Sequence, residues 1–160
     1  MDNSRGKILW IDDEINQLKP HILFLEERGY EVSTSNNGVD ALNLFDAHSY
    51  DLILLDHFMI GIDGIETLRR IKEKDPSVPI IMITKSEEEW LMDEAISEKI
   101  SQFLIKPVNP SQIFMACKQI LEKITIRNEK VSKVYLGEFK KIESYIENAN
   151  HLMDWWNLYN

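Results

Sequence analysis

The sequence predicts an α/β protein: a doubly wound, five-stranded parallel sheet whose strands alternate with helices, followed by a C-terminal helical extension. Over the first two thirds of the chain, short continuous apolar runs alternate with longer amphipathic segments. This is the pattern of parallel strands covered on both faces. The 160 residues are 44% hydrophobic and 28% charged, so the chain can bury a sizeable core without a disulfide or a structural metal.

The predicted strands are the apolar runs at residues 7–11, 30–35, 51–55, 79–83 and 102–105. Between them, apolar residues recur at helical spacing, and pairs such as Asn37-Gly38 and Asp75-Pro76 mark turns and helix ends. We expect five strand–helix units in this part of the chain.

Three helix starts are indicated by particular residues. Pro20 would remove a hydrogen bond inside a helix, so the first helix should begin near Gln17 or be kinked. Ser86 and Glu89 have the spacing of a capping box. Asn109-Pro110 supplies an N-cap followed by proline at the first helical position.

After about residue 122 the pattern is helical throughout, and its apolar stripe has no partner of its own. We therefore expect two units: a domain at 1–122, and a helical segment at 123–160 that begins a helical bundle truncated in this chain. The alternative is a terminal helix folded back on its own domain. Trp155, Trp156 and Tyr159 would pack on a partner in the first case and within the chain in the second.

Charge and hydropathy exclude several classes of partner. The net charge of -9 has the wrong sign for binding phosphates, so we expect no nucleic-acid partner. No apolar stretch approaches the ~18–20 residues that span a bilayer, and residues 1–7 lack the apolar core of a secretory signal. The sequence predicts a cytoplasmic protein without membrane insertion, in which Cys117 is a buried core residue.

Polar side chains follow the predicted strands at their carboxyl ends. Asp12 and Asp13 follow the first strand, Asp56 the third, Thr84 the fourth and Lys106 the fifth. The carboxyl ends of parallel strands lie on one edge of the sheet, where ligands usually bind. These side chains should therefore meet in one pocket.

Three adjacent carboxylates repel one another and favour a bound cation or proton. An all-oxygen site without suitably spaced His or Cys suits Mg²⁺. If one carboxylate attacks phosphorus, the resulting acyl phosphate needs charge partners, which the metal, Thr84 and Lys106 would supply. Pro107 would fix the loop after Lys106, through a cis bond if one forms.

These residues, in their order, strand context and intervals, resemble the receiver domain of two-component response regulators over residues 5–122. The resemblance implies a flavodoxin-like fold with strand order 2-1-3-4-5. It implies that Asp56 accepts a phosphoryl group from a sensor histidine kinase. It also implies a Mg²⁺ site made of Asp12, Asp13, Asp56 and the backbone carbonyl of Phe58.

In that family, Thr84 and Lys106 would bind the phosphoryl oxygens. Phe103 matches the switch aromatic that turns inward after Thr84 moves, while apolar periodicity equally predicts a strand core residue there. The charge added when Asp56 is phosphorylated would then move the loops that carry Thr84 and Lys106.

Three residues depart from the family pattern or stand beside the acceptor. Ile60 replaces the usual proline, so its loop should be less rigid. Lys85 stands where the family prefers a small residue, and would either shield the acyl phosphate or help to bind it; we expect slow hydrolysis. His57, beside the acceptor, could be catalytic, but its place at a strand-to-loop turn favours a solvated or packing role.

A narrower resemblance rests on segments 8–14, 18–26, 82–89 and 104–110, which are similar to those of PorX-type response regulators. That family combines a receiver, a helical bundle and a PglZ output domain, and is associated with type IX secretion. The resemblance implies that this chain is the receiver and the start of the bundle, without the output enzyme.

The expected output of the switch is a surface formed by the last strand, the last helix and the helix after Ser86. Trp90 and Leu91 would lie on this surface, although Trp90 could also be core. We expect an acyl-phosphate mimic with Mg²⁺ to favour a homodimer through it. The chain would then be a signalling switch that catalyses only its own phosphorylation and dephosphorylation.

Two other classes of function compete with this one. A haloacid-dehalogenase-like phosphohydrolase would need a second Asp two residues after Asp56, where Phe58 stands. A phosphorylation-independent pseudo-receiver, acting only as an adaptor module, is favoured by the departures at Ile60 and Lys85.

Overall fold

The structure is a computed structural model that describes residues 4–85 and 87–159, apart from the side chains of Trp155 and Tyr159. The chain divides into two units, Met1–Leu121 and Glu122–Asn160. The first unit contains the whole sheet. Among the described helices, none is both long enough and apolar enough to cross a membrane.

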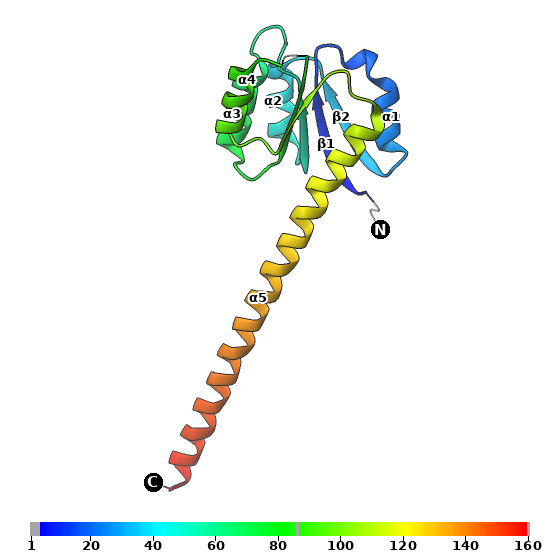
Figure 1. Cartoon of the computed structure of the whole chain (residues 1–160). Coiled ribbons are helices and arrows are strands. Elements are labelled where there is room, and N and C mark those ends of the chain that lie inside the picture. Colours follow the sequence, from blue (N-terminus) through cyan, green and yellow to red (C-terminus); the bar gives the residue numbers. More distant parts are fainter. Residues whose placement is uncertain (1–3, 86, 160) are drawn as a thin grey trace. The chain divides into compact units, whose positions relative to one another are not determined.

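The first unit is built on five parallel strands in the order β2-β1-β3-β4-β5 (Figure 1). Each observed strand lies within one residue of its predicted run at either end. This confirms the predicted flavodoxin-like fold. The strands are β1 (Gly6–Ile11), β2 (Tyr30–Ser35), β3 (Leu52–Leu55), β4 (Ile80–Thr84) and β5 (Gln102–Ile105).

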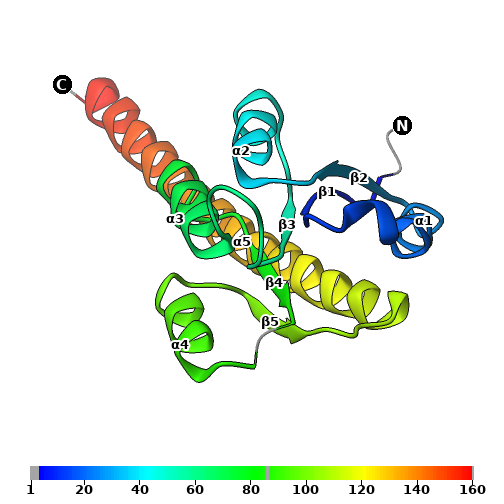
Figure 2. The ribbon, with the colours of Figure 1, turned by 90° about the horizontal axis from the view of Figure 1, so that it is seen from above.

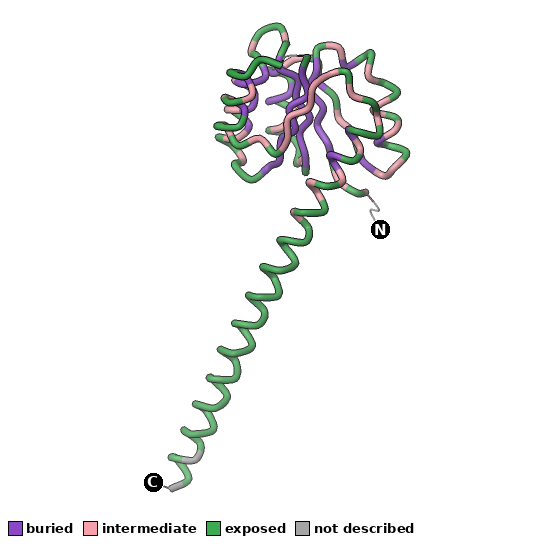
Figure 3. The backbone as a smooth tube through the Cα atoms, viewed as in Figure 1, coloured by how far each residue is buried: buried purple, intermediate pink, exposed green. Residues whose placement is uncertain are grey.

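Helices cover both faces of the sheet (Figure 2). Alternate strand residues point to opposite faces, so Leu9 packs beneath α2, α3 and α4 while Ile8 packs beneath α1 and the first turns of α5. In Figure 3 the buried residues, in purple, lie mainly in the central strands and on the inner faces of the helices, whereas the last strand, residues 102–105, is intermediate and pink. The helices are α1 (Lys19–Glu26), preceded by the 3-10 turn η1 (Ile15–Gln17), α2 (Gly38–Ala47), α3 (Gly64–Lys74), α4 (Glu89–Ser97) and α5 (Pro110–Tyr159).

The helix starts agree with the sequence in two places and differ in one. Pro20 lies in the first turn of α1, where its missing N–H costs no hydrogen bond. The side chain of Asn109 accepts a hydrogen bond from the Gln112 amide at 2.9 Å, which caps α5. The helix expected from the Ser86 capping box instead begins at Glu89, with Glu88 as N-cap and no side-chain cap bond; Ser86 itself lies outside the described residues.

The inner face of α4 contradicts one expectation. Leu91 is buried with Ala95, one turn later, in the core beneath α4, so it is not part of an output surface. Trp90, one position earlier and about 100° around the helix, is 54% exposed.

Cys117 is a free, buried thiol on the inner face of α5, as predicted. Burial raises its pKa to about 12, since a thiolate is poorly solvated in the core. The thiol therefore stays protonated at neutral pH.

The second unit is a single helical segment that continues α5 without a break. Between residues 111 and 136 there is no Gly or Pro to end the helix. A single helix by itself offers no second helix or strand against which its apolar stripe could be buried. Its apolar side chains, including those of Tyr135, Phe139, Ile142 and Trp156, are exposed.

Gly64, the first residue of α3, allows this helix to begin directly against the end of β3. A Cβ at this position would lie 2.4 Å from the Asp56 carbonyl oxygen and 2.6 Å from the His57 Cα. Both atoms are backbone and cannot move without displacing the loop. The glycine therefore lets the helix pack against the loop that follows Asp56.

We predict that Gly64→Ala lowers the free energy of unfolding by about 1–3 kcal/mol, the usual cost of forcing extra volume into a packed site. Urea denaturation measures this directly. Gly137→Ala is the matched control, because its Cβ would meet nothing within 4 Å. Equal stability of the two variants would contradict the close approach at Gly64.

Candidate functional site

The sheet brings the predicted polar residues to one edge. The Asp56 amide donates to the Ile11 carbonyl at 2.9 Å, and the Lys106 amide donates to the Thr84 carbonyl at 2.8 Å. These backbone bonds align the ends of β1, β3, β4 and β5. The side chains that follow the four strands therefore share one location, as the strand-end pattern predicted.

Three carboxylates form the acidic part of the site. Asp12, Asp13 and Asp56 each place an oxygen within 4.8 Å of the others. Asp12 is fully buried and Asp56 is 4% exposed, whereas Asp13 is exposed. Two backbone amides orient the buried pair: Glu14 donates to Asp12 Oδ1 at 2.9 Å, and His57 donates to Asp56 Oδ1 at 2.8 Å.

Lys106, whose side chain is 13% exposed, provides the positive charge of the site. Its Nζ lies 2.7 Å from Asp12 Oδ2 and 3.3 Å from Asp56 Oδ2. Burial opposes the charge on Lys106, but the hydrogen bond and charge of Asp12, with those of Asp56, outweigh it and raise the pKa of Lys106. The amine is therefore an ammonium at physiological pH.

Burial raises the pKa of Asp56, and the neighbouring charge of Asp12 adds to this effect, although Lys106 opposes it. One ammonium thus does not fully compensate the carboxylates. The oxygen donors fit a hard divalent cation, for which Mg²⁺ is the usual choice at a site with few protein ligands. Asp12, Asp13 and Asp56 are the side chains that would hold it.

The predicted switch residues lie on the β4 and β5 side of the site. Thr84, the last residue of β4, is fully buried. Phe103 in β5 is partly buried against the core beneath α4. The Lys106–Pro107 peptide bond, in the loop that carries the ammonium, is cis.

The loop after Asp56 is part buried and part exposed. His57 is 6% exposed, so it is not solvated, and its ring contacts those of Phe58 and Trp90 with centroids 4.9 Å and 6.0 Å away. Packing is one of the two roles, solvated or packing, that the sequence favoured over a catalytic role. Phe58 follows with an exposed ring, and Ile60 is 87% exposed.

One contact was not predicted. Lys85 Nζ donates to Glu14 Oε2 at 2.6 Å, which joins the loop after β4 to the loop after β1. The hydrogen bond and the charge of Lys85 lower the pKa of Glu14, and Glu14 in turn raises the pKa of Lys85. The two residues are 71 positions apart and both are exposed, so no sequence periodicity links them.

Comparison with known proteins decides the family. Residues 8–118 match the response regulator receiver domain. The chain belongs to this receiver family. It is 35% identical over 117 residues to the transcriptional regulatory protein ResD of Bacillus subtilis, covering 73% of this chain and 48% of that protein. It is 33% identical over 146 residues to a CpxR homolog of Haemophilus influenzae, covering 90% of this chain and 63% of that protein.

A similar solved structure is the CheY-like receiver domain protein of Methanospirillum hungatei, with a TM-score of 0.70 and 25% identity over 73% of this chain and 94% of that one. Receiver domains are signalling switches that sensor histidine kinases phosphorylate, and they generally use Mg²⁺ at an acidic pocket. The chain spans about half the length of the first curated relatives it matches.

We predict that Asp56→Asn raises the melting temperature at pH 7 in EDTA, because the amide avoids the cost of burying a charge. The folded pKa of Asp56 lies above its unfolded value, near 3.9. Its stabilising contribution is therefore present below the unfolded pKa and lost as the pH rises through the folded pKa.

The difference in melting temperature between Asp56→Asn and wild type should accordingly shrink as the pH falls toward about 4. Thermal melts from pH 8 to pH 4 measure it, with the exposed Asp93→Asn as the control. A melting temperature of Asp56→Asn below that of wild type at pH 7 would contradict the sign of the shift.

Proposed function

We propose that this chain is a phosphorylation-dependent receiver in which Asp56 accepts the phosphoryl group. The observation that supports this most is the position of Asp56 between opposite charges. It lies 3.3 Å from the Lys106 ammonium and within 4.8 Å of the Asp12 and Asp13 carboxylates. A nucleophile, a charge partner and a metal-compatible acid cluster are thus together at one sheet edge.

In the proposed transfer, an Asp56 carboxylate oxygen attacks the phosphorus of a kinase phosphohistidine. The O–P bond forms as the P–N bond breaks, and the imidazole leaves with the electron pair and takes up a proton. Lys106 and the Thr84 hydroxyl would hold the transferred oxygens. Mg²⁺, held by Asp12, Asp13, Asp56 and the Phe58 carbonyl, would neutralise part of the phosphoryl charge.

Phosphorylation would change the charge at Asp56 while Lys106 is already paired with Asp12. Lys106 and Thr84 would then move toward the phosphoryl oxygens, and Phe103 would turn inward as Thr84 moves. The surface of α4, β5 and the first turns of α5 would transmit the change. Trp90, exposed on α4, is the residue we assign to a homodimer contact there.

The output of the switch lies outside this chain in our proposal. We infer a PorX-type regulator in the cytoplasm, in which 1–122 is the receiver and 123–160 opens a helical bundle that leads to a PglZ output domain and a role in type IX secretion. The exposed apolar side chains of this segment and its near-neutral charge support a protein partner. The relatives named above are transcriptional regulators, so a DNA-binding output domain is the competing proposal.

Incubation with acetyl phosphate and Mg²⁺, followed by intact mass measurement, tests the central proposal. We expect one added phosphoryl group, removable with hydroxylamine, in wild type and none in Asp56→Ala. Absence of an adduct in wild type would favour the phosphorylation-independent adaptor. Multiple-turnover phosphate release would favour a phosphohydrolase.

Lys85 is proposed to slow loss of the phosphoryl group by covering the site from solvent, through its bond to Glu14. We predict that Lys85→Ala shortens the acyl-phosphate half-life severalfold, as followed by mass spectrometry after the phosphodonor is removed. Lys74→Ala is the control, because Lys74 pairs with Asp46 instead. An unchanged half-life in Lys85→Ala would overturn this role.

Beryllofluoride with Mg²⁺, a mimic of the acyl phosphate, should shift the chain toward a dimer in sedimentation velocity. Trp90→Ala should weaken that dimer about tenfold if Trp90 is a central contact. Ile126→Ala is the control, since Ile126 is similarly exposed but lies outside the proposed surface. Identical sedimentation with and without the mimic, well above micromolar concentration, would reject the dimer.

A further inference from the structure

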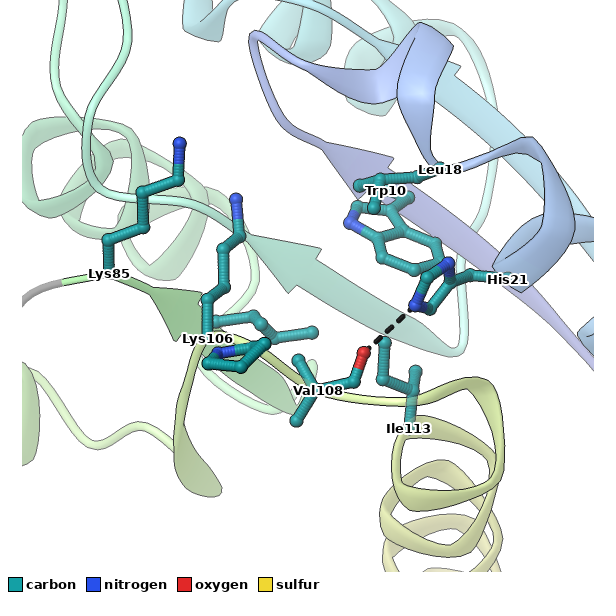
Figure 4. A pocket seen from close by; sticks show the side chains of 9 residues that line it. Trp10, Leu18, His21, Lys85, Lys106, Val108 and Ile113 are labelled. Atoms are coloured by element: carbon teal, nitrogen blue, oxygen red, sulfur yellow. Dashed lines mark hydrogen bonds between the residues drawn. The ribbon is translucent and has the colours of Figure 1, made fainter.

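A pocket of about 380 Å³ lies beside the acidic site, between α1 and the loop that joins β5 to α5. Figure 4 shows that Trp10 of β1 and His21 of α1 form one side, and Lys106 with Val108 the other. The remaining lining residues are Leu18, Ile83, Lys85, Pro107 and Ile113. Asp12, Asp13 and Asp56 are not among them, so the pocket lies beside the acid cluster and shares only Lys106 with the ion pairs of that cluster.

The pocket contains a buried hydrogen-bond donor without a partner. Trp10 is 1% exposed, and its Nε1–H finds no acceptor among the described residues. In Figure 4 the edge of the indole that carries Nε1 faces the side where Lys106 lies. Buried indole N–H groups normally have a partner, so this donor points to a ligand acceptor.

The wall opposite Lys106 is held in place by side-chain contacts. His21 Nε2 lies 2.9 Å from the Val108 carbonyl oxygen, and because a carbonyl can only accept, Nε2–H is the donor. The His21 ring meets Trp10 edge-on, with centroids 6.3 Å apart. These contacts link α1, β1 and the loop after β5 on one side of the pocket.

The charges near the pocket favour a neutral ligand over an anion. Its two lysines are both engaged: Lys106 with Asp12 and Asp56, and Lys85 with Glu14. A ligand carboxylate would compete with these acids and approach their negative charge. The other lining side chains are mostly apolar, and the volume lies within the range of about 300–1,000 Å³ typical of small-molecule sites.

We propose that this pocket binds a small, neutral, largely apolar molecule whose carbonyl oxygen accepts the Trp10 indole N–H. The apolar body would pack against Leu18, Val108 and Ile113. The proposal does not depend on phosphorylation of Asp56, because every residue it uses is in place in the unmodified chain.

Titrations of the ¹⁵N-labelled full chain in EDTA, without a phosphodonor, test the site. The indole Nε1–H resonance of Trp10, assigned by its loss in Trp10→Phe, is the readout. The probes are acetophenone, which has a ring and a neutral acceptor, ethylbenzene, which lacks the acceptor, and benzoate, which carries a charge. We expect acetophenone to shift this resonance saturably, and ethylbenzene and benzoate to bind about tenfold more weakly.

Val108→Phe, which fills the pocket and keeps the carbonyl that binds His21, should remove the acetophenone response. Ile96→Phe, at an exposed position on α4, is the matched control and should keep it. The site is overturned if the Trp10 resonance does not move up to the solubility limit of acetophenone. The assignment to a neutral acceptor is overturned if ethylbenzene or benzoate binds as tightly as acetophenone.

Discussion

The geometry of the site depends on one ion cluster, in which the Lys106 ammonium lies between the carboxylates of Asp12 and Asp56. Buried carboxylates are costly without a partner, and a single ammonium brings the ends of β1, β3 and β5 into one charged centre. Burial raises the pKa of Asp56 and the charge of Asp12 adds to this effect, so the Lys106 ammonium opposes the shift without cancelling it. The site is therefore predisposed to gain positive charge from a metal and to respond when Asp56 changes its own charge.

The sheet makes that cluster possible because helices cover both of its faces. Alternate residues of β1, β3 and β4 point to opposite faces of the sheet and belong to two separate hydrophobic cores. Polar side chains can therefore gather only at the ends of these strands. Gly64 also shapes the site, because its lack of a side chain allows α3 to begin directly against the Asp56 backbone. The Asp56 residue is thus confined by packing against α3 on one side and by the charge of Lys106 on the other.

Much of this could be predicted from sequence, because continuous apolar runs identify buried parallel strands, and the polar residues after these runs identify the sheet edge where charged side chains gather. The start of α4 could not be predicted in the same way. Several residues before the helix are possible caps, and it is Glu88, not Ser86, that precedes the first turn. Leu91 was misplaced because one amphipathic turn does not reveal which side faces the sheet. Neither the Lys85–Glu14 pair nor the pocket beside Trp10 could be predicted from the sequence. In a strand, a tryptophan that lines a pocket and a tryptophan in the core follow the same alternating pattern.

The protonated, buried thiol of Cys117 has a practical consequence for spectroscopy of this protein. It is the chain's single cysteine, and thiol-specific dyes react with exposed thiolates. A cysteine introduced on an exposed turn of α4 would therefore take up a fluorophore or spin label selectively. Reporter groups could then be placed on α4 while the native core keeps its own sulfur.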